Sequence, residues 1–432
     1  MNSKKVNRRQ FLKTAGGAAA AICFPHIVPS SVLAAETPPS NRITLGFIGM
    51  GMQGTDLEKL FLNERGAEVV AVCDVDSLKL ERASNIAEQY YAGHNDKGTF
   101  KGCAAYRDFR DLLARDDIDA VVIATPDHWH SLIAVYAARA GKDIYCEKPI
   151  SQTVAEAREM VKTVRRYGRV FQAGSMQRSD SRFRFTCELV RNGFIGEVKT
   201  IIAGIGGPPV ECDLPAEPAP DYLDWDMWLG PAPWRPYNEV LSPHISKTHF
   251  PDWRRYSDYG GGATTDWGAH HFDIAQWALD MDSSGPVEIY PPDGGNEIIY
   301  KYANGVILTR QEPAEWKDYT VTFEGTEGKI VVHREYMNTQ PSNLINTKFR
   351  PNDIRLYKSN NHYADWLQSI RSRSKPICDV ETGCRSATVC HIGNIVYELK
   401  RPLRWDPERE HFVDDAEADR LLSRSKRSPW RM

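Results

Sequence analysis

Residues 43–54 read ITLGFIGMGMQG, an apolar run that ends directly in three glycines with the spacing G-x-G-x-x-G. The run is typical of a strand buried on both faces, and the glycines are typical of the turn between that strand and a helix. Gly49 lets the chain turn tightly, Gly51 lets a ligand approach the backbone, and Gly54 lets the helix pack closely on the strand. The stretch predicts the first unit of a doubly wound α/β domain.

The sequence that follows keeps the same alternation as far as residue 175. Apolar runs rich in Val, Ile and Ala are separated by stretches of helical length. Such alternation predicts a parallel sheet with helices on both faces, and residues 42–175 are expected to form one Rossmann domain. We expect further strands within 67–76, 118–126, 141–149 and 169–174, and helices near 77–90, 107–115, 129–140 and 152–167.

The pattern changes after residue 176. A strand-like run at 197–205 is followed by a long irregular segment, 207–259, that is rich in Pro, Trp and Tyr. Later runs are joined by turn signals at Asn304-Gly305 and at Gly325–Gly328. Short strands joined in this way predict a large, mainly antiparallel sheet with one open face, the hallmark of an α+β domain.

This second domain is expected to span residues 176–410 and to bind the substrate. Helical patterns at 362–376 and 384–400 are expected to pack back on it. The locally basic end of the chain, within 411–432, is interpreted as a solvated C-terminal tail.

The first residues have the composition of an export signal. NRRQFLK at 7–13 resembles the twin-arginine motif, and SVLAAE contains a small-residue cleavage site near Ala34 or Ala35. The apolar run between them is too short for a stable membrane span. We expect a twin-arginine signal peptide at 1–35, a linker at 36–41, recognition by the twin-arginine export machinery, and a periplasmic or otherwise exported protein. Because this pathway carries folded proteins, the signal also hints at a cofactor loaded before export.

The overall charge argues against two classes of partner. The formal net charge is −3 over 432 residues, and hydrophobic residues make up 41% of the chain. Such a chain is a globular protein without a broad attraction to nucleic acid or anionic lipid.

Asp74 indicates which kind of ligand the glycine turn binds. It ends the second expected strand, twenty residues after Gly54. A carboxylate there accepts hydrogen bonds from the ribose hydroxyls of a dinucleotide whose pyrophosphate lies at the helix N-terminus. The same carboxylate repels a 2′-phosphate, so the sequence favours NAD over NADP. The segment TPDHWH, residues 125–130, follows another strand at the same sheet edge, where the nicotinamide half is expected to pass.

Four segments occur in the order that is found in one enzyme family. They are the glycine turn, TPDHWH at 125–130, EKP at 147–149 after GKDIYC, and D-x-x-x-H at 266–270. With these segments, residues 42–410 resemble the Gfo/Idh/MocA oxidoreductases, which include glucose–fructose oxidoreductase and inositol dehydrogenase. The expected cofactor contacts come from Gly49, Gly51, Met52, Gln53, Gly54, Asp74, Thr125, Pro126, Trp129, His130, Glu147, Lys148 and Gln177.

The resemblance also implies a catalytic group. It places Lys148 beside the nicotinamide and the reacting hydroxyl, and it pairs an Asp with a His four residues later, here Asp266 and His270. Residues four apart share one helix face, so both can meet one hydroxyl. The base needs a pKa near the working pH, which suits His270, while Lys148 stabilises the developing alkoxide. Which of the three takes the proton stays open.

Neighbouring residues admit several interpretations. Asp273 is one turn past His270 and can fix its tautomer. His271 points about 100° away on a helix and is expected to pack or to line the substrate pocket. Arg178 and Gln177 follow the last strand of the first domain; we expect Arg178 to contact substrate.

Two other uses of 260–273, GGGATTDWGAHHFD, were weighed. A metal site is disfavoured because adjacent histidines diverge on a helix and no third ligand has a recognisable spacing. The stretch can also be only a helix start, capped by Thr264 or Thr265. The aromatic residues of 222–238 form either a stacking wall for sugar rings or ordinary loop packing, and His128 is interpreted as a surface residue.

The sequence thus predicts an exported NAD-dependent oxidoreductase that acts on a sugar, glycoside or cyclitol hydroxyl, with a tightly held cofactor. One alternative is an NAD-dependent glycosidase that resembles those of family 109. The resemblance implies that such an enzyme oxidises C3 transiently and then eliminates the aglycone. Another is an NAD-binding sensor without catalysis. A homo-oligomer through the open sheet face is also expected.

Overall fold

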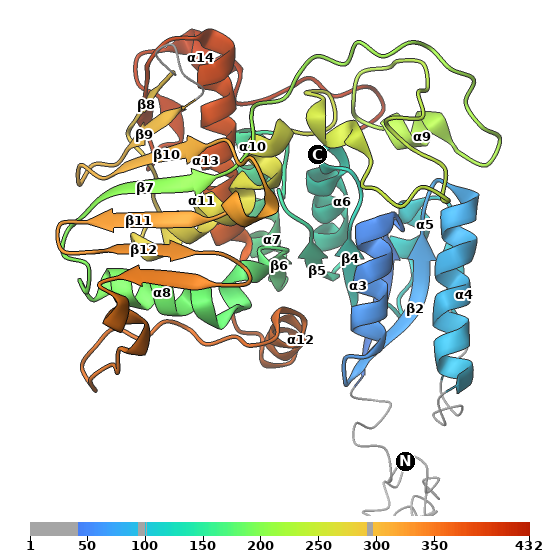
Figure 1. The fold of residues 1–432 in the computed structure, drawn as a ribbon. Helices are drawn as coiled ribbons and strands as arrows, with labels where there is room; N and C mark the ends of the chain where they lie inside the picture. The colour runs from blue at the N-terminus through green and yellow to red at the C-terminus, as the bar shows by residue number, and fades with distance from the viewer. Residues whose placement is uncertain (1–41, 94–99, 101, 292–296) are drawn as a thin grey trace, which may run out of the picture.

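The computed structural model of the chain describes residues 42–93, 100, 102–291 and 297–432. The expected signal peptide, 1–35, and linker, 36–41, lie outside the described residues. Two sheets stand side by side, and helices lie between and behind them (Figure 1). In the part of the chain that the structure describes, no helix is both long and apolar enough to cross a membrane.

Six parallel strands form the first sheet within the described residues, in the order β3-β2-β1-β4-β5-β6. This order confirms the doubly wound fold. The sequence forms it because the central strands are mainly apolar and almost wholly buried, with Thr44 and Asp143 as the polar exceptions. The strands are β1 (Ile43–Ile48), β2 (Ala67–Cys73), β3 (Ala104–Tyr106), β4 (Ala120–Ile123), β5 (Asp143–Cys146) and β6 (Phe171–Ala173). The helices are α3 (Met52–Leu62), α4 (Ser77–Gly93), α5 (Phe109–Leu113), α6 (Asp127–Arg139) and α7 (Val154–Arg166).

The second sheet has nine strands among the described residues, in the order β13-β12-β11-β7-β10-β9-β8-β14-β15. Strands β7 and β10 pair in parallel, and the other pairs are antiparallel, so the mainly antiparallel sheet is confirmed. Gly305, with φ 84°, makes the expected turn between β9 and β10. The strands are β7 (Val198–Gly204), β8 (Glu288–Tyr290), β9 (Ile299–Lys301), β10 (Ile307–Gln311), β11 (Val321–Gly325), β12 (Lys329–Val332), β13 (Met337–Gln340), β14 (Leu403–Asp406) and β15 (His411–Phe412).

Helices cover one face of this sheet and leave the other open (Figure 1). The covering helices contact strands β7, β8, β11 and β12. The helices of this half are α8 (Ser181–Arg191), α10 (Gly262–Asp266), α11 (Gly268–Ala278), α13 (Val380–Leu399) and α14 (Ala416–Arg420), with short 3₁₀ turns η2 (Met176–Ser179), η4 (Trp316–Asp318) and η5 (Ser342–Asn346).

The last two long helices do not both pack on the second sheet. Helix α13 lies between α11 and α7 and so joins the two halves. Helix α12 (His362–Ser372) packs on the first domain instead, where Trp366 is fully buried with its ring 5.6 Å from Phe61 and 5.7 Å from Tyr145. The expectation that both helices pack back on the second domain is therefore wrong for α12. An amphipathic pattern tells which face is buried and not against which sheet.

The end of the chain also returns to the first domain. Trp430 is 7% exposed, and its ring lies 4.8 Å from that of Trp129. Arg427 donates from Nε to the Gly230 carbonyl at 2.9 Å. The interpretation of this tail as a solvated segment is wrong, because its single tryptophan anchors it.

The segment 207–259 arches over the upper edge of the first sheet (Figure 1). It contains α9 (Trp225–Leu229) and the 3₁₀ turn η3 (Asp252–Arg255). Its aromatic residues pack on one another: the rings of Trp225 and Trp228 stack at 4.7 Å, and Trp228 also meets Tyr259 at 5.1 Å. Loop packing is therefore their role, except for Trp234, which is 65% exposed.

Candidate active site

The glycine turn has the shape that a dinucleotide requires. Gly49 has φ +91°, and a Cβ there would lie 2.6 Å from the Thr125 amide nitrogen. A Cβ on Gly54 would lie 1.9 Å from the Gly49 carbonyl oxygen, so only glycine lets α3 begin so close to the turn. A Cβ on Gly51, by contrast, would meet nothing within 4 Å. Open space at Gly51, beside the free amides of a helix start, fits a pyrophosphate.

Asp74 ties this turn to the end of β2. Its Oδ2 accepts from the Met50 amide at 2.6 Å, and its Oδ1 accepts from the Asp76 amide at 2.9 Å. Burial raises the pKa of Asp74, and the nearby Lys79 ammonium opposes that rise. A carboxylate oxygen has two lone pairs, so each oxygen can still accept from a ribose hydroxyl.

A cavity lies between the glycine turn and the covering segment 207–259. Eight of the thirteen expected cofactor residues line it, namely Gly49, Gly51, Met52, Gln53, Asp74, Thr125, Pro126 and Trp129. The covering segment supplies the opposite wall, including Trp228, Leu241 and Arg254. The cavity ends short of Lys148 and Asp266, which do not line it, but it reaches Arg254, whose Nε is 3.9 Å from Asp266 Oδ1.

Lys148 and Asp266 form an ion pair between the two domains. Lys148 Nζ donates to Asp266 Oδ1 at 2.5 Å and to the Asp266 carbonyl at 2.8 Å. Burial works against the charge of Asp266, but Lys148 and then Arg254 outweigh it and hold the pKa of Asp266 below its ordinary value. Asp266 is thus ionised, and it fixes the position of the Lys148 ammonium.

His270 lies one turn beyond Asp266. The two residues lie on separate short helices, α10 and α11, joined at Trp267, whose backbone is still right-handed helical. His270 is 6% exposed, and its Nδ1 has no hydrogen-bond partner among the described residues. Burial and the positive charge of Lys148 hold the pKa of His270 well below 6.5. The imidazole is neutral and can accept a proton, although its pKa does not lie near neutrality as expected.

The helix start in this stretch is not capped as expected. Gly261 is the residue before α10, and no side chain caps it. Thr265 lies inside the helix, where its Oγ1 accepts from the Gly261 amide at 3.1 Å. Thr264 Oγ1 is buried and has no partner in the described part of the chain.

His271 packs against the second sheet. It is fully buried, and its Nδ1 lies 3.1 Å from the Gly204 carbonyl oxygen on β7. Burial lowers the pKa of His271 to about 3. The 100° separation on the helix turns His271 toward the sheet, which fits the packing alternative, and its contact with substrate stays a prediction.

His130 positions the lysine loop and does not face a ligand. Its Nδ1 lies 2.7 Å from the Pro149 carbonyl oxygen, and its Nε2 lies 2.8 Å from that of Thr125. A neutral imidazole donates to one of these at a time, and burial lowers the pKa of His130 to about 4. His130 therefore bridges the loops after β4 and β5, which corrects its assignment as a cofactor contact.

The two residues before His130 anchor the covering segment. Trp129 lines the cavity with its ring and donates from Nε1 to the Trp228 carbonyl at 3.0 Å. His128 Nε2 lies 3.0 Å from the same oxygen. His128 is only 2% exposed, so its interpretation as a surface residue is wrong.

Glu147 is held by protein groups. Its Oε1 accepts from Gln53 Nε2 at 3.1 Å, and its Oε2 accepts from the Lys148 amide at 3.2 Å. A Cβ on Gly174 would lie 2.7 Å from Glu147 Oε2, so the carboxylate fills the space beside that glycine. Glu147 thus braces the loop that carries Lys148.

Gln177, unlike Glu147, has a side chain that no protein group binds among the described residues. It is 2% exposed, yet neither Oε1 nor Nε2 has a hydrogen-bond partner among the described residues. A buried amide without partners is costly, so both ends of this side chain are available to bind a ligand group. A primary amide pairs well with the carboxamide of a nicotinamide or with a hydroxyl.

Replacing Gln177 with leucine is expected to weaken NAD⁺ binding about tenfold and not to lower the thermal midpoint of the unliganded protein. The second half follows because no protein hydrogen bond is lost. Calorimetric titration and thermal unfolding measure the two effects, and the control is Gln152→Leu, at a glutamine whose Nε2 donates to the Ser257 carbonyl at 3.4 Å. Unchanged affinity in Gln177→Leu would remove Gln177 from the cofactor site.

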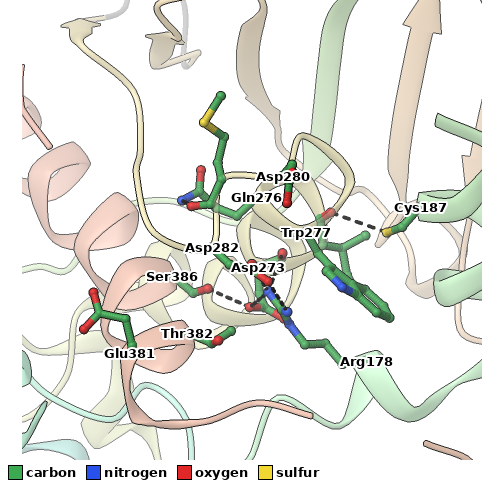
Figure 2. Close-up of polar contacts among 12 residues, drawn as sticks. Arg178, Cys187, Asp273, Gln276, Trp277, Asp280, Asp282, Glu381, Thr382 and Ser386 are labelled. Carbon is green, nitrogen blue, oxygen red and sulfur yellow. Dashed lines mark hydrogen bonds and ion pairs between the residues drawn. The ribbon is translucent and has the colours of Figure 1, made fainter. Parts of the chain in front are cut away.

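Arg178 is buried in a cluster of charges that Figure 2 shows. It donates from Nε and Nη2 to Asp273 at 2.8 and 2.9 Å, and from Nη1 and Nη2 to Asp282 at 2.9 and 2.6 Å. Ser386 of α13 donates to Asp273 Oδ1 at 2.6 Å. Arg178 is 1% exposed and lies 5.1 Å from the Trp277 ring.

Two expectations are corrected by this cluster. Arg178 does not contact substrate, because its donors are spent on the two aspartates. Asp273 does not fix the tautomer of His270, because Arg178 and Ser386 occupy it. The cluster instead fixes α11, which carries His270, against α13 and η2.

Three residues near the ion pair were given no role from the sequence. Asp127 is 5% exposed at the start of α6, and burial raises its pKa well above its ordinary value. Arg254 lies in the irregular segment 207–259, whose sequence has no helical or strand periodicity that would place its side chain. Arg334 follows β12 and lies with its guanidinium 4.7 Å from the Trp267 ring. Only Asp127, inside the quoted TPDHWH, had a sequence signal.

Comparison with known families agrees with this geometry. Residues 43–175 match the oxidoreductase family with an NAD-binding Rossmann fold, and residues 210–432 match the C-terminal alpha/beta domain of the same oxidoreductase family. Residues 5–25 match the twin-arginine translocation signal, which indicates export.

The chain is similar to curated and to solved proteins. A glycosyl hydrolase family 109 protein from Shewanella pealeana is 32% identical over 211 residues, which is 45% of this chain and 44% of that protein. Another from a Shewanella species is 37% identical over 171 residues, or 36% of each chain. The matched region thus spans less than half the length of these relatives.

Two solved structures share the fold. The myo-inositol 2-dehydrogenase from Lactobacillus plantarum has a TM-score of 0.57 at 19% identity, over 84% of this chain and 99% of that one. The WlbA dehydrogenase from Bordetella pertussis, solved with NADH and UDP-GlcNAcA, has a TM-score of 0.60 at 16% identity, with the same coverage. Through its two matched domains, this chain belongs to the Gfo/Idh/MocA family of NAD-binding oxidoreductases, and it carries a twin-arginine export signal.

Proposed function

We propose that this protein is an exported, NAD-dependent oxidoreductase that transfers hydride between nicotinamide and a sugar, glycoside or cyclitol hydroxyl carbon. The observation that carries the proposal is the Lys148–Asp266 ion pair, with the neutral His270 one turn away, next to Arg254 of the cavity at the glycine turn. A cation, a carboxylate and an uncharged imidazole in one place supply the groups that alcohol oxidation needs.

Each residue has a distinct part in this proposal. Nicotinamide, when bound, supplies the hydride acceptor. Lys148 Nζ donates a hydrogen bond to the substrate hydroxyl oxygen and stabilises negative charge as it develops there. His270 Nδ1, which has no partner among the described residues, accepts the hydroxyl proton. Asp266 holds Lys148 in place and can accept from a second hydroxyl.

The covering segment supports a tightly held cofactor. Segment 207–259 forms one wall of the cavity and is itself fastened by Trp129 and by Arg427 near the chain end. A cofactor bound beneath it leaves only when this wall moves. Retention of NAD(H) suits an exported enzyme, since free NAD is scarce outside the cytoplasm.

Asp74 supports the preference for NAD. Substituting Asp74 with serine is expected to reduce the NAD-over-NADP ratio of kcat/KM about tenfold or more, because the charge that repels a 2′-phosphate is gone. The control is Asp76→Asn, a carboxylate two residues on that accepts from the Leu78 amide at 2.9 Å. If the ratio is the same in Asp74→Ser as in the native protein, the carboxylate does not select the cofactor.

A second candidate is a redox-neutral glycosidase of the family 109 type. It is favoured by the curated relatives, which are named as glycosyl hydrolases of that family. The same lysine and histidine would serve its transient oxidation step, so the site geometry alone does not separate the two.

One experiment separates these functions. The purified protein is loaded with NAD⁺ and incubated with a panel of free sugars, cyclitols and nitrophenyl glycosides. Growth of the reduced-nicotinamide absorbance without aglycone release supports the dehydrogenase. Aglycone release without net reduction supports the glycosidase, and failure to bind NAD(H) overturns both.

The open face of the second sheet supports a homo-oligomer, which we include in the proposal. Ile202, Ile299, Ile307 and Val331 lie half-buried on strands β7, β9, β10 and β12 of this sheet. Pairing of two copies through this face would remove that apolar surface from water. Light scattering of the purified protein tests it: a monomeric mass would contradict the pairing.

A further inference from the structure

Arg334 lies beside the proposed reaction centre and serves no part of the mechanism. It sits in the turn between β12 and β13, and its guanidinium carbon is 4.7 Å from the centre of the Trp267 ring. Trp267 is the residue between Asp266 and the helix that carries His270. The charge of Arg334 acts on Asp266, His270 and His271, lowering the pKa of each.

The guanidinium has no anionic partner in the described part of the chain. Its Nε is buried without a hydrogen bond among the described residues, and its guanidinium stacks on the ring of Trp267. The nearest strong candidate, Asp266, is already bound by Lys148 at 2.5 Å. A half-buried cation without an ion-pair partner within 4 Å is costly, so the pairing partner is expected to arrive with a ligand.

That ligand is not the pyrophosphate of the dinucleotide. Arg334 does not line the dinucleotide cavity, whereas Arg254 does. The pyrophosphate position is set by the glycine turn and the start of α3, which line that cavity. We therefore expect the anionic group that pairs with Arg334 to be part of the substrate.

The surroundings of Arg334 indicate how a sugar would lie. Trp267 belongs to an aromatic group that also contains Tyr319, at 4.3 Å, and Trp316, at 5.6 Å, and Trp316 is 46% exposed. Aromatic side chains offer flat apolar surfaces to sugar rings, and the stacked guanidinium keeps its N–H edge free. Its planar fork matches a carboxylate through two parallel hydrogen bonds.

We propose that the substrate is an acidic sugar, a uronic acid or its glycoside, whose carboxylate is bound by Arg334 while a ring hydroxyl meets Lys148 and His270. This proposal rests on the proposed function, since it names the substrate class of the same site. It adds a specificity residue on the second domain, in a turn that carries no sequence motif.

The test compares acids with neutral sugars of the same ring. Dissociation constants are measured by calorimetry on NADH-loaded protein for methyl glycosides of glucuronic, galacturonic and mannuronic acid and of the matching neutral hexoses. At least one acid is expected to bind about 10- to 100-fold more tightly than its neutral partner. Arg334→Gln is expected to abolish that advantage and to leave the neutral affinity unchanged.

A matched control is available in Arg355. It also stacks on an aromatic ring, that of Phe349 at 4.4 Å, but its Nη2 is paired with Glu188 Oε2 at 3.2 Å. Arg355→Gln should keep the preference for acids, and Arg334→Lys should keep only part of it because the fork is lost. The proposal is overturned if no acid outbinds its neutral partner, if the advantage survives Arg334→Gln, or if hexose 6-phosphates alone depend on Arg334.

These binding measurements need no turnover, which separates the two proposals. If acidic sugars bind in an Arg334-dependent way but NAD⁺ is never reduced, the proposed oxidation is contradicted and the proposal of an acidic ligand is supported. Reduction of NAD⁺ by neutral sugars, unaffected by Arg334→Gln, would keep the oxidation and sink the acidic substrate.

Discussion

Replacing Lys148 with alanine is expected to lower kcat about 10³-fold while changing the affinity for NAD(H) only a few-fold. The ammonium donates to Asp266 at the centre of the proposed site, where negative charge develops on the substrate oxygen. The loss falls on kcat because this contact strengthens only as the hydroxyl is oxidised. Steady-state kinetics and cofactor titration measure the two quantities separately.

The strand that leads to Lys148 also provides the control. Lys142 precedes β5 as Lys148 follows it, and its Nζ donates to the carbonyls of Arg115 and Ile118 at 2.5 and 2.9 Å. Lys142→Met should lower stability and leave kcat of the folded enzyme intact. Native turnover in Lys148→Ala would contradict the assignment of the site.

Replacing Arg178 with leucine is expected to destabilise the fold by about 3–5 kcal/mol, because it leaves a buried carboxylate without its cationic partner. Asp273 is fully buried, and Asp282 is partly exposed, so the cost falls mainly on Asp273. Chemical denaturation measures the loss. Asp282→Asn should cost much less, since water reaches that side chain.

The pH dependence of Arg178→Leu gives a second readout. Burial already raises the pKa of Asp273, and Arg178 opposes that rise. Without the arginine the folded-state pKa rises further, so the folded state binds a proton that the unfolded state releases. Stability of the variant is then greatest below the unfolded pKa, about 3.9, and falls as pH rises toward the folded pKa. If the variant instead keeps native stability and loses substrate affinity, Arg178 contacts the substrate and the structural role is contradicted.

The first domain was predictable because its signals are local. Gly49, Gly51 and Gly54 occupy positions that the turn geometry dictates, and Asp74 follows at the spacing set by one strand–helix–strand unit. The buried apolar runs identify the strands for the same reason. Each of these features is decided within about thirty residues of chain.

The rest depends on contacts that are distant in sequence. Helical spacing separates the directions of His270 and His271 by about 100°, but it does not show that His271 meets β7. Arg178 looked like a substrate residue because its partners, Asp273 and Asp282, lie about a hundred positions away. Arg334 reaches the site only because the turn after β12 folds over Trp267.

The central claim is that hydride passes between a substrate carbon and the nicotinamide at Lys148. The most direct measurement uses NAD⁺-loaded protein and a substrate from the panel, deuterated on its ring carbons. Mass spectrometry of the released cofactor is expected to find deuterium at nicotinamide C4 in the native protein and none in Lys148→Ala. Consumption of the substrate with a cofactor that stays free of deuterium would contradict it.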